Sequence, residues 1–175
     1  IRVVGVGGGL RLECRAAIGA CREKVRLGQL SFDVSDDQAR REYVERGFWL
    51  ELDTGHVDQT LNLRPVKALK YVKGEDSSFS LLEVPMLYTY PGEGCRRIRW
   101  ERAAPRPLTG EEQASLPSLA QPGLAAAVKL AKNQFKNTLL PKFLPVLLPV
   151  GRIGAVDGVP VLEAPARGRI SLPEP

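Results

Sequence analysis

The sequence predicts an α+β fold with an antiparallel β-meander at its centre, and two patterns support this class. Apolar and polar residues alternate in short runs between positions 48 and 102, which is typical of strands with one buried face. Apolar residues recur at helical spacing in residues 10–27 and again in residues 124–140. We therefore expect an N-terminal strand and two helices, then the meander, and finally a helix and a β-hairpin.

The N-terminal part begins with a short apolar strand over residues 2–6, and a run of glycines interrupts it. In the predicted helix over residues 10–27, Cys14 and Cys21 fall on the same apolar face, two turns apart. Such a spacing, roughly 10.5 Å along a straight helix, is too long for a disulfide bond. We therefore expect both thiols to be reduced and buried.

A second helix is predicted over residues 35–47. Ser35 and Gln38 have the spacing of a capping box, in which two side chains bond to the first backbone amides of a helix. Asp36 and Asp37 favour the positive end of the helix dipole, where a helix begins. Gly47 then supplies a residue suited to the left-handed conformation at a helix end.

The clearest pair of strands spans residues 79–90 and 95–102, with a Pro-Gly-Glu-Gly turn between them. In the second strand, Ile98 and Trp100 alternate with charged residues, so one face is apolar and the other is charged. We therefore expect the two strands to pair and the ring of Trp100 to be largely buried.

A proline-rich stretch over residues 105–123 is predicted to be a linker. It separates a core of residues 1–104 from a C-terminal segment of residues 124–175, which holds a helix and a hairpin. The hairpin is predicted from Asp157-Gly158 between two apolar runs, since this dipeptide suits a two-residue turn. The C-terminal segment either packs on the core or forms a small appendage.

The composition excludes several classes of protein. The chain of 175 residues is 43% hydrophobic, and no apolar run approaches the roughly 20 residues that cross a bilayer. Three cysteines and one histidine, without a C-x-x-C pair, favour neither a disulfide framework nor a structural zinc site. We therefore expect no membrane, no metal and no cofactor, and a reducing, cytoplasmic location.

Positive charge is unevenly distributed along the chain. The net charge is +5, and no acidic residue lies between Gln113 and Val156. Arginines also cluster after the turn at residues 91–94, next to tyrosines whose rings could stack on bases while the arginines hold phosphates. The residues that we expect to contact nucleic acid are Arg96, Arg97, Arg99, Arg102, Lys129, Lys132 and Lys136.

The single histidine lies in a turn between two aspartates. Together, Asp53, His56 and Asp58 are the weak candidates for a catalytic cluster, since a histidine next to carboxylates can act as a general base. A histidine in a turn also occurs with no catalytic role, solvated or bonded to its neighbours. Both interpretations stay open.

Two short motifs resemble those of known enzyme families. The apolar strand and glycines at residues 2–9 resemble the opening strand and phosphate loop of nucleotide-binding folds, such as the FtsZ family. The triplet Asp53-Thr54-Gly55 after an apolar strand resembles the active-site triplet of retropepsin-like aspartic proteases. The first resemblance implies nucleotide binding, and the second implies a dimer in which two aspartates share a proton.

The function expected from the sequence is a non-catalytic binding or assembly module that contacts nucleic acid, or another anionic partner, through its arginines. Protein partners are also compatible with such a module. The alternative is an enzyme fragment that acts on a nucleotide, through the glycines at residues 5–9, or a retropepsin-like protease that uses Asp53.

Overall fold

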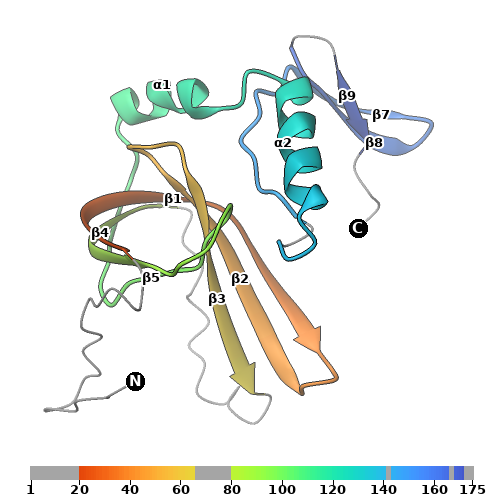
Figure 1. Cartoon of the computed structure of the whole chain (residues 1–175). Coiled ribbons are helices and arrows are strands. Elements are labelled where there is room, and N and C mark those ends of the chain that lie inside the picture. The colour runs from red at the N-terminus through yellow and green to blue at the C-terminus, as the bar shows by residue number, and fades with distance from the viewer. Residues whose placement is uncertain (1–19, 66–79, 141–142, 166–167, 172–175) are drawn as a thin grey trace, which may run out of the picture.

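The structure, a computed structural model, describes residues 20–65, 80–140, 143–165 and 168–171. These residues form a six-stranded antiparallel sheet, two helices and a smaller three-stranded sheet in chain order (Figure 1). The predicted class is confirmed: the fold is α+β, strands dominate it, and an antiparallel meander forms its centre. The strands of the larger sheet are β1 (Ala20–Asp37), β2 (Glu42–Glu51), β3 (Val57–Pro65), β4 (Leu81–Thr89), β5 (Ile98–Arg99) and β6 (Ala104–Arg106).

Strand β1 is shared between two neighbours. Its first half, residues 20–28, pairs with β4, and its second half, residues 27–37, pairs with β2. The register between β1 and β2 shifts between Gln29 and Ser31, and Lys24 has a positive φ of 54°. Irregularities of this kind bend a strand, so β1 can curve from one neighbour to the other.

Strands β5 and β6 continue one another. Both pair with β4 in the same register, since Tyr88 faces Arg99 and Glu83 faces Ala104. The start of this interrupted strand meets β3, where the Gln59 amide donates to the Arg96 carbonyl over 2.8 Å. The sheet thus closes into a small barrel with the cyclic order β1–β2–β3–β5–β4, which is the topology of the OB fold.

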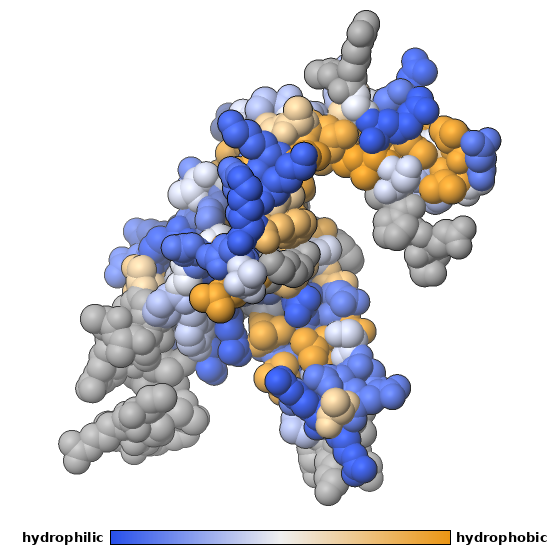
Figure 2. Space-filling model, turned by 45° about the vertical axis from the view of Figure 1, so that its right-hand side comes forward, coloured by the Kyte–Doolittle hydropathy of each residue, from blue (hydrophilic) through white to orange (hydrophobic). Residues whose placement is uncertain are grey.

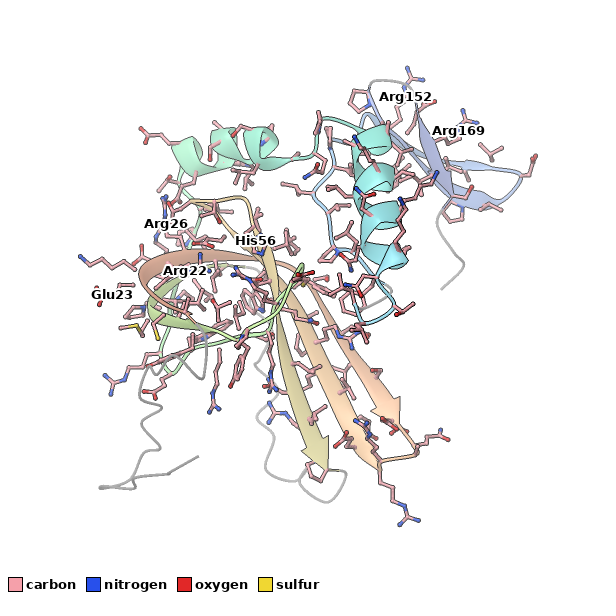
Figure 3. All side chains as sticks on the ribbon, viewed as in Figure 1. Arg22, Glu23, Arg26, His56, Arg152 and Arg169 are labelled. Atoms are coloured by element: carbon pink, nitrogen blue, oxygen red, sulfur yellow. The ribbon has the colours of Figure 1, made fainter. Side chains whose placement is uncertain are left out.

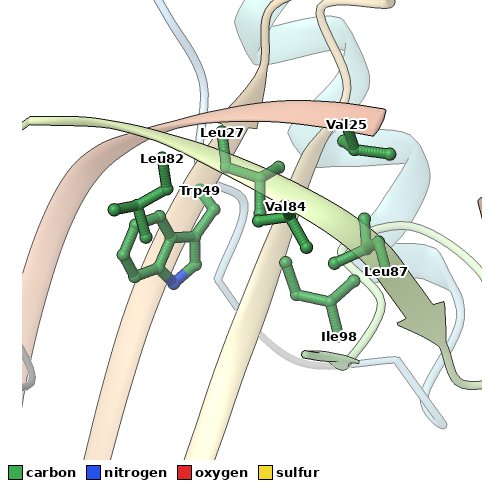
Figure 4. Close-up of a cluster of buried hydrophobic side chains, with 7 residues drawn as sticks. All are labelled: Val25, Leu27, Trp49, Leu82, Val84, Leu87 and Ile98. Carbon is green, nitrogen blue, oxygen red and sulfur yellow. The ribbon is translucent and has the colours of Figure 1, made fainter. Parts of the chain in front are cut away.

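The barrel interior is filled by apolar side chains from β1, β2, β4 and β5 (Figure 4). Trp49 is 2% exposed, and its indole N–H donates to Thr60 Oγ1 over 3.0 Å. Trp100 packs edge-on against Trp49 with ring centroids 5.0 Å apart, but it is only half-buried. The predicted pairing of the two strands is therefore confirmed, whereas Trp100 is only partly buried and Trp49 is the tryptophan of the buried cluster. The buried cluster consists of Val25, Leu27, Trp49, Leu82, Val84, Leu87 and Ile98.

Helix α1 (Gly110–Leu119) lies inside the stretch predicted to be a linker. Its N-terminus has a capping box, in which Thr109 Oγ1 accepts from the Glu112 amide and the Glu112 carboxylate accepts from the Thr109 amide. Glu112 also binds Arg26 of β1 at 2.9 Å and Arg106 of β6 at 2.6 Å. This buried carboxylate therefore fastens α1 to the barrel, while the division of the chain into 1–104, 105–123 and 124–175 stays a prediction.

The C-terminal elements agree with the sequence patterns. Helix α2 (Leu124–Lys136) corresponds to the predicted helix, and β7 (Arg152–Val156) and β8 (Val159–Glu163) form the predicted hairpin. Asp157 and Gly158 both have positive φ, as the two-residue turn requires. A third strand, β9 (Arg169–Ser171), pairs with β8, and apolar side chains of this part of the chain stay exposed (Figure 2).

The helix predicted over residues 35–47 is wrong, because these residues form the hairpin between β1 and β2. The Asp37 carboxylate accepts from the Arg40 amide over 3.1 Å and so shapes a turn instead of capping a helix. Arg41 takes a positive φ of 55° in the same turn. Because β2 pairs with both β1 and β3, hydrogen bonds between strands outweigh the local preference for a helix.

The helix predicted over residues 10–27 is also wrong for its described part, since residues 20–27 belong to β1. Cys21 is disulfide-bonded, which contradicts the prediction of a reduced thiol. This bond removes one reason to expect a reducing location. Cys14 and the predicted strand over residues 2–6 lie outside the described residues.

We predict that Trp49→Ala lowers the free energy of unfolding by about 3–5 kcal/mol, because it removes a large buried ring from the core. Trp100→Ala should cost clearly less, since its side chain is only partly buried. Urea unfolding followed by circular dichroism measures both changes. An equal or larger loss for Trp100→Ala would contradict the assignment of the core.

A second prediction concerns Glu112. The hydrogen bonds from Arg106 and from the Thr109 amide hold the pKa of Glu112 well below its usual range. A carboxyl with a depressed pKa stabilises the fold above its unfolded pKa of about 4.3, and this stabilisation is lost as the pH falls through the folded pKa. Glu112→Gln should therefore be less stable than the wild type at pH 7. The difference in free energy of unfolding between the two proteins should become smaller below about pH 4.

The matched control is Glu111→Gln, which removes the same charge from an exposed neighbour in the first turn of α1. Urea midpoints at pH 7, 5, 4 and 3 give the comparison for all three proteins. A gap between wild type and Glu112→Gln that does not change with pH would show that the ion pairs of Glu112 carry no stability.

Candidate functional site

The arginines that the sequence singles out have different roles in the structure. Arg96 faces inward and is bound to Asp58, which is 3% exposed. Its Nη2 lies 3.2 Å from Asp58 Oδ2, and its backbone amide donates to Asp58 Oδ1 over 3.0 Å. This contact joins the loop before β5 to strand β3, so Arg96 closes the barrel and is not a free surface cation.

Arg97 and Arg99 face outward together with two tyrosines. Thr89 is buried, so Tyr88 and Tyr90 on either side of it point to the outer face of the barrel. Tyr88 lies directly opposite Arg99 in the ladder, and the Arg97 guanidinium lies 5.3 Å from the centroid of the Tyr90 ring. We name these four residues the tyrosine–arginine platform.

The Arg97 side chain is also held by a hydrogen bond to strand β3. Its Nη2 donates to the carbonyl of Leu61 on β3 over 2.7 Å, and its other side-chain N–H groups bond to none of the residues that the structure describes. Arg99 is exposed, and it has no carboxylate partner among the residues that the structure describes. The platform therefore carries two cations with unused donors beside two aromatic rings.

The predicted lysines lie on helix α2. Lys129, Lys132 and Lys136 are exposed and follow one another at spacings of three and four, so they share one side of the helix. No carboxylate of the described residues pairs with them, and the same is true of Arg102. A Cβ atom at Gly94 would lie 3.4 Å from Gln134 Oε1, so α2 borders the loop that carries Tyr90 and Arg97.

The candidate catalytic residues do not form one cluster. His56 Nε2 lies 3.3 Å from Asp58 Oδ1, which brings these two residues together. Asp53 turns away from them and forms an ion pair with Arg26. The triplet that begins at Asp53 forms the turn between β2 and β3, and its glycine has a φ of 70°. The glycines at residues 5–9 lie outside the described residues.

The end of the barrel next to His56 is polar, and sequence reasoning missed two of its residues. Arg22 and Glu51 form an ion pair there, and Thr54 Oγ1 donates to Glu51 Oε2 over 3.0 Å. Arg22 lies opposite the buried Leu87 in the ladder, so it points into the barrel and not along the polar face of a helix. We name this end the barrel mouth.

No family model, curated protein or solved structure matches this chain. Within the described ranges, no helix is long and apolar enough to cross a membrane. The same ranges contain no group of three or more His, Cys, Asp or Glu side chains that could hold a metal. The function is therefore inferred from the geometry of the platform, of α2 and of the barrel mouth.

We predict that Cys95 is unreactive in the folded protein. Burial, reinforced by the nearby negative charge of Asp58, raises the pKa of Cys95 to about 12. At pH 8 the reactive thiolate is then on the order of one ten-thousandth of the population. Iodoacetamide labelling followed by peptide mass spectrometry should leave Cys95 unmodified until urea unfolds the chain. Equal labelling of Cys95 with and without urea would contradict its burial.

Proposed function

We propose that this protein is a non-catalytic module that binds single-stranded nucleic acid through the tyrosine–arginine platform and the lysines of α2. The observation that carries the proposal is the stacking of Arg97 over Tyr90, next to the ladder pair of Tyr88 and Arg99. These four side chains combine both elements that single strands require, namely aromatic faces and positive charge.

The chemistry of the platform suits a flexible strand. Base stacking on an aromatic ring contributes about 1–3 kcal/mol per base and tolerates any base, because each base has a π-face. Arginines can bind phosphate oxygens with two N–H groups at once. Helix α2 adds three exposed lysines, which pair with no carboxylate of the described residues and lie on the side of the helix opposite Gln134, in a part of the chain without acidic residues. Contacts of this kind favour binding that is sensitive to salt and weakly selective for sequence.

The topology of the barrel supports the proposal by analogy. OB barrels that bind oligonucleotides use the outer face of their second and third strands and the loops between strands 1–2 and 4–5. In this chain, Tyr90 and Arg97 lie in the segment between β4 and β5, and Arg97 reaches the β3 carbonyl of Leu61. A fold hosts many functions, so the analogy adds to the argument from the side chains and does not replace it.

The proposal predicts that Arg97→Ala/Arg99→Ala binds single strands at least about tenfold more weakly, since two phosphate contacts and a stacked cation are lost. Fluorescence anisotropy with labelled RNA and DNA 20-mers, at two or more salt concentrations, measures the affinity. With about six phosphates contacted, the log–log salt slope of the wild type should be about −4, and the double variant should reduce it by about 1.4.

The matched control is Arg152→Ala/Arg169→Ala, which removes the same charge from the small C-terminal sheet (Figure 3). This control should bind almost like the wild type, and circular dichroism should show that both double variants are folded. Absence of binding at 50 mM salt, or an equal loss in the two double variants, would sink the proposal.

A further inference from the structure

The barrel mouth contains a cavity of about 440 Å³. Its lining consists only of polar side chains and glycines: Arg22, Thr54, His56, Gly92, Gly94 and Arg96. Figure 3 shows Arg22 and His56 at the same end of the barrel, near the turn between β2 and β3. A cavity of this size falls within the range of small-molecule sites, and barrel mouths are frequent positions for such sites.

The carboxylates near the cavity are already occupied. Asp58 accepts three hydrogen bonds from Arg96, two from the guanidinium and one from the backbone amide. Glu51, which is 5% exposed, is bound by Arg22 and by the hydroxyl of Thr54. Neither carboxylate is in the lining of the cavity. The charged groups that border the open space are therefore cationic or neutral.

Two polar nitrogen atoms at the mouth have no hydrogen-bond partner among the described residues. Arg22 Nη2 and His56 Nε2 are both buried without a hydrogen bond among the described residues, although each lies within 4 Å of an Asp58 oxygen. Buried polar atoms in native proteins nearly always have a partner. Arg96 also keeps Nη1 free of the contacts with Asp58. The mouth thus keeps polar side-chain atoms that its own carboxylates do not bind in the described structure.

The loop on the other side of the cavity leaves room for a ligand. Gly92 and Gly94 have φ values of 154° and 70°, a region that favours glycine. A Cβ atom at Gly92 would meet no atom within 4 Å, so this wall faces open space. Because glycine has no side chain, the loop backbone can approach a bound group closely.

From this arrangement we propose that the barrel mouth binds a phosphate monoester, with Arg22, Arg96 and His56 as its donors. The planar guanidinium fork matches the oxygens of a phosphate, and two forks border one cavity. A metal cation is disfavoured by the same two charges. The cavity is larger than a phosphate ion, so it accommodates the group that the phosphate esterifies. The ester is a free nucleotide or the terminal phosphate of a nucleic acid strand.

Isothermal titration calorimetry tests the proposal with inorganic phosphate, a nucleoside 5′-monophosphate and the nucleoside that lacks phosphate. The monophosphate should bind, and the nucleoside should not. Arg22→Gln should lower the affinity for the monophosphate at least about tenfold, which is the loss expected for a charged hydrogen bond. Arg22→Lys should restore part of the affinity, because it returns the charge without the fork.

Arg22→Gln leaves the buried Glu51 without its arginine, so its fold must be verified by circular dichroism. His56→Ala is the second variant, because this side chain is 42% exposed and its loss disturbs the core little. His56→Ala should lower the affinity for the monophosphate by about two- to tenfold. Arg152→Gln, on the small sheet, is the control and should not change the affinity. No binding of the monophosphate, or binding that Arg22→Gln and His56→Ala leave unchanged, would overturn the proposal.

Oligonucleotides with a 5′-phosphate or a 5′-hydroxyl identify the source of the ester. Tighter binding of the phosphorylated strand, lost with His56→Ala, would assign the mouth to a strand end, whereas equal binding would assign it to a free nucleotide. The two proposals of this article fail separately. If nucleic acid strands bind through the platform and the monophosphate does not bind, only the proposal for the barrel mouth fails. If the monophosphate binds and the strands do not, only the proposal for the platform fails.

Discussion

Strand β1 hydrogen-bonds to β4 along its first half and to β2 along its second half, and the closed barrel depends on this sharing. A strand with two different neighbours along its length has to bend, and the register shift after Gln29 accommodates the bend. Closure then brings the inner faces of β1, β2, β4 and β5 around one core, which includes Trp49. Without β1 in both ladders, β2–β3 and β4–β5 would be separate hairpins, and isolated hairpins are marginally stable.

The second contact on which the barrel depends is the ion pair of Asp58 and Arg96, because it joins β3 to the loop before β5. A buried pair of this kind contributes little net stability over apolar packing, but the loss of one partner is costly. The arginines of this short segment lie on two sides of the barrel, one inside and one outside. Arg96 points into the mouth, and Arg97, its neighbour in sequence, points outward to Tyr90. A strand reverses the side at each residue, so one cluster in the sequence supplies both candidate sites.

A second cluster of charges, next to the turn between β2 and β3, is structural. Glu112 is held by Arg26 and Arg106 while it closes the capping box of α1, so two guanidinium groups and the Thr109 amide share one carboxylate. The described arginines thus differ in their partners: some bind carboxylates, some lie over aromatic rings and others face solvent. Those that bind carboxylates keep fewer donors for a ligand, so a count of basic residues overstates the surface available to an anionic partner.

The sequence by itself determined the elements whose signals are local. Asp157-Gly158 predicts its hairpin, the spacing in α2 predicts its helix, and the alternation around Ile98 predicts the pairing of β4 with β5. Tertiary structure decided the rest. The local signals of Ser35 and Gln38 favour a helix, but pairing on both sides of β2 makes these residues a hairpin, because ladders between distant strands outweigh a capping box. The same applies to the sites. The sequence identifies Arg97, Arg99 and His56 as candidates. It does not predict that His56 contacts Asp58, that Asp53 pairs with Arg26 or that Arg22 lies in the mouth. Those contacts join residues far apart in the chain, and they exist only because the barrel closes.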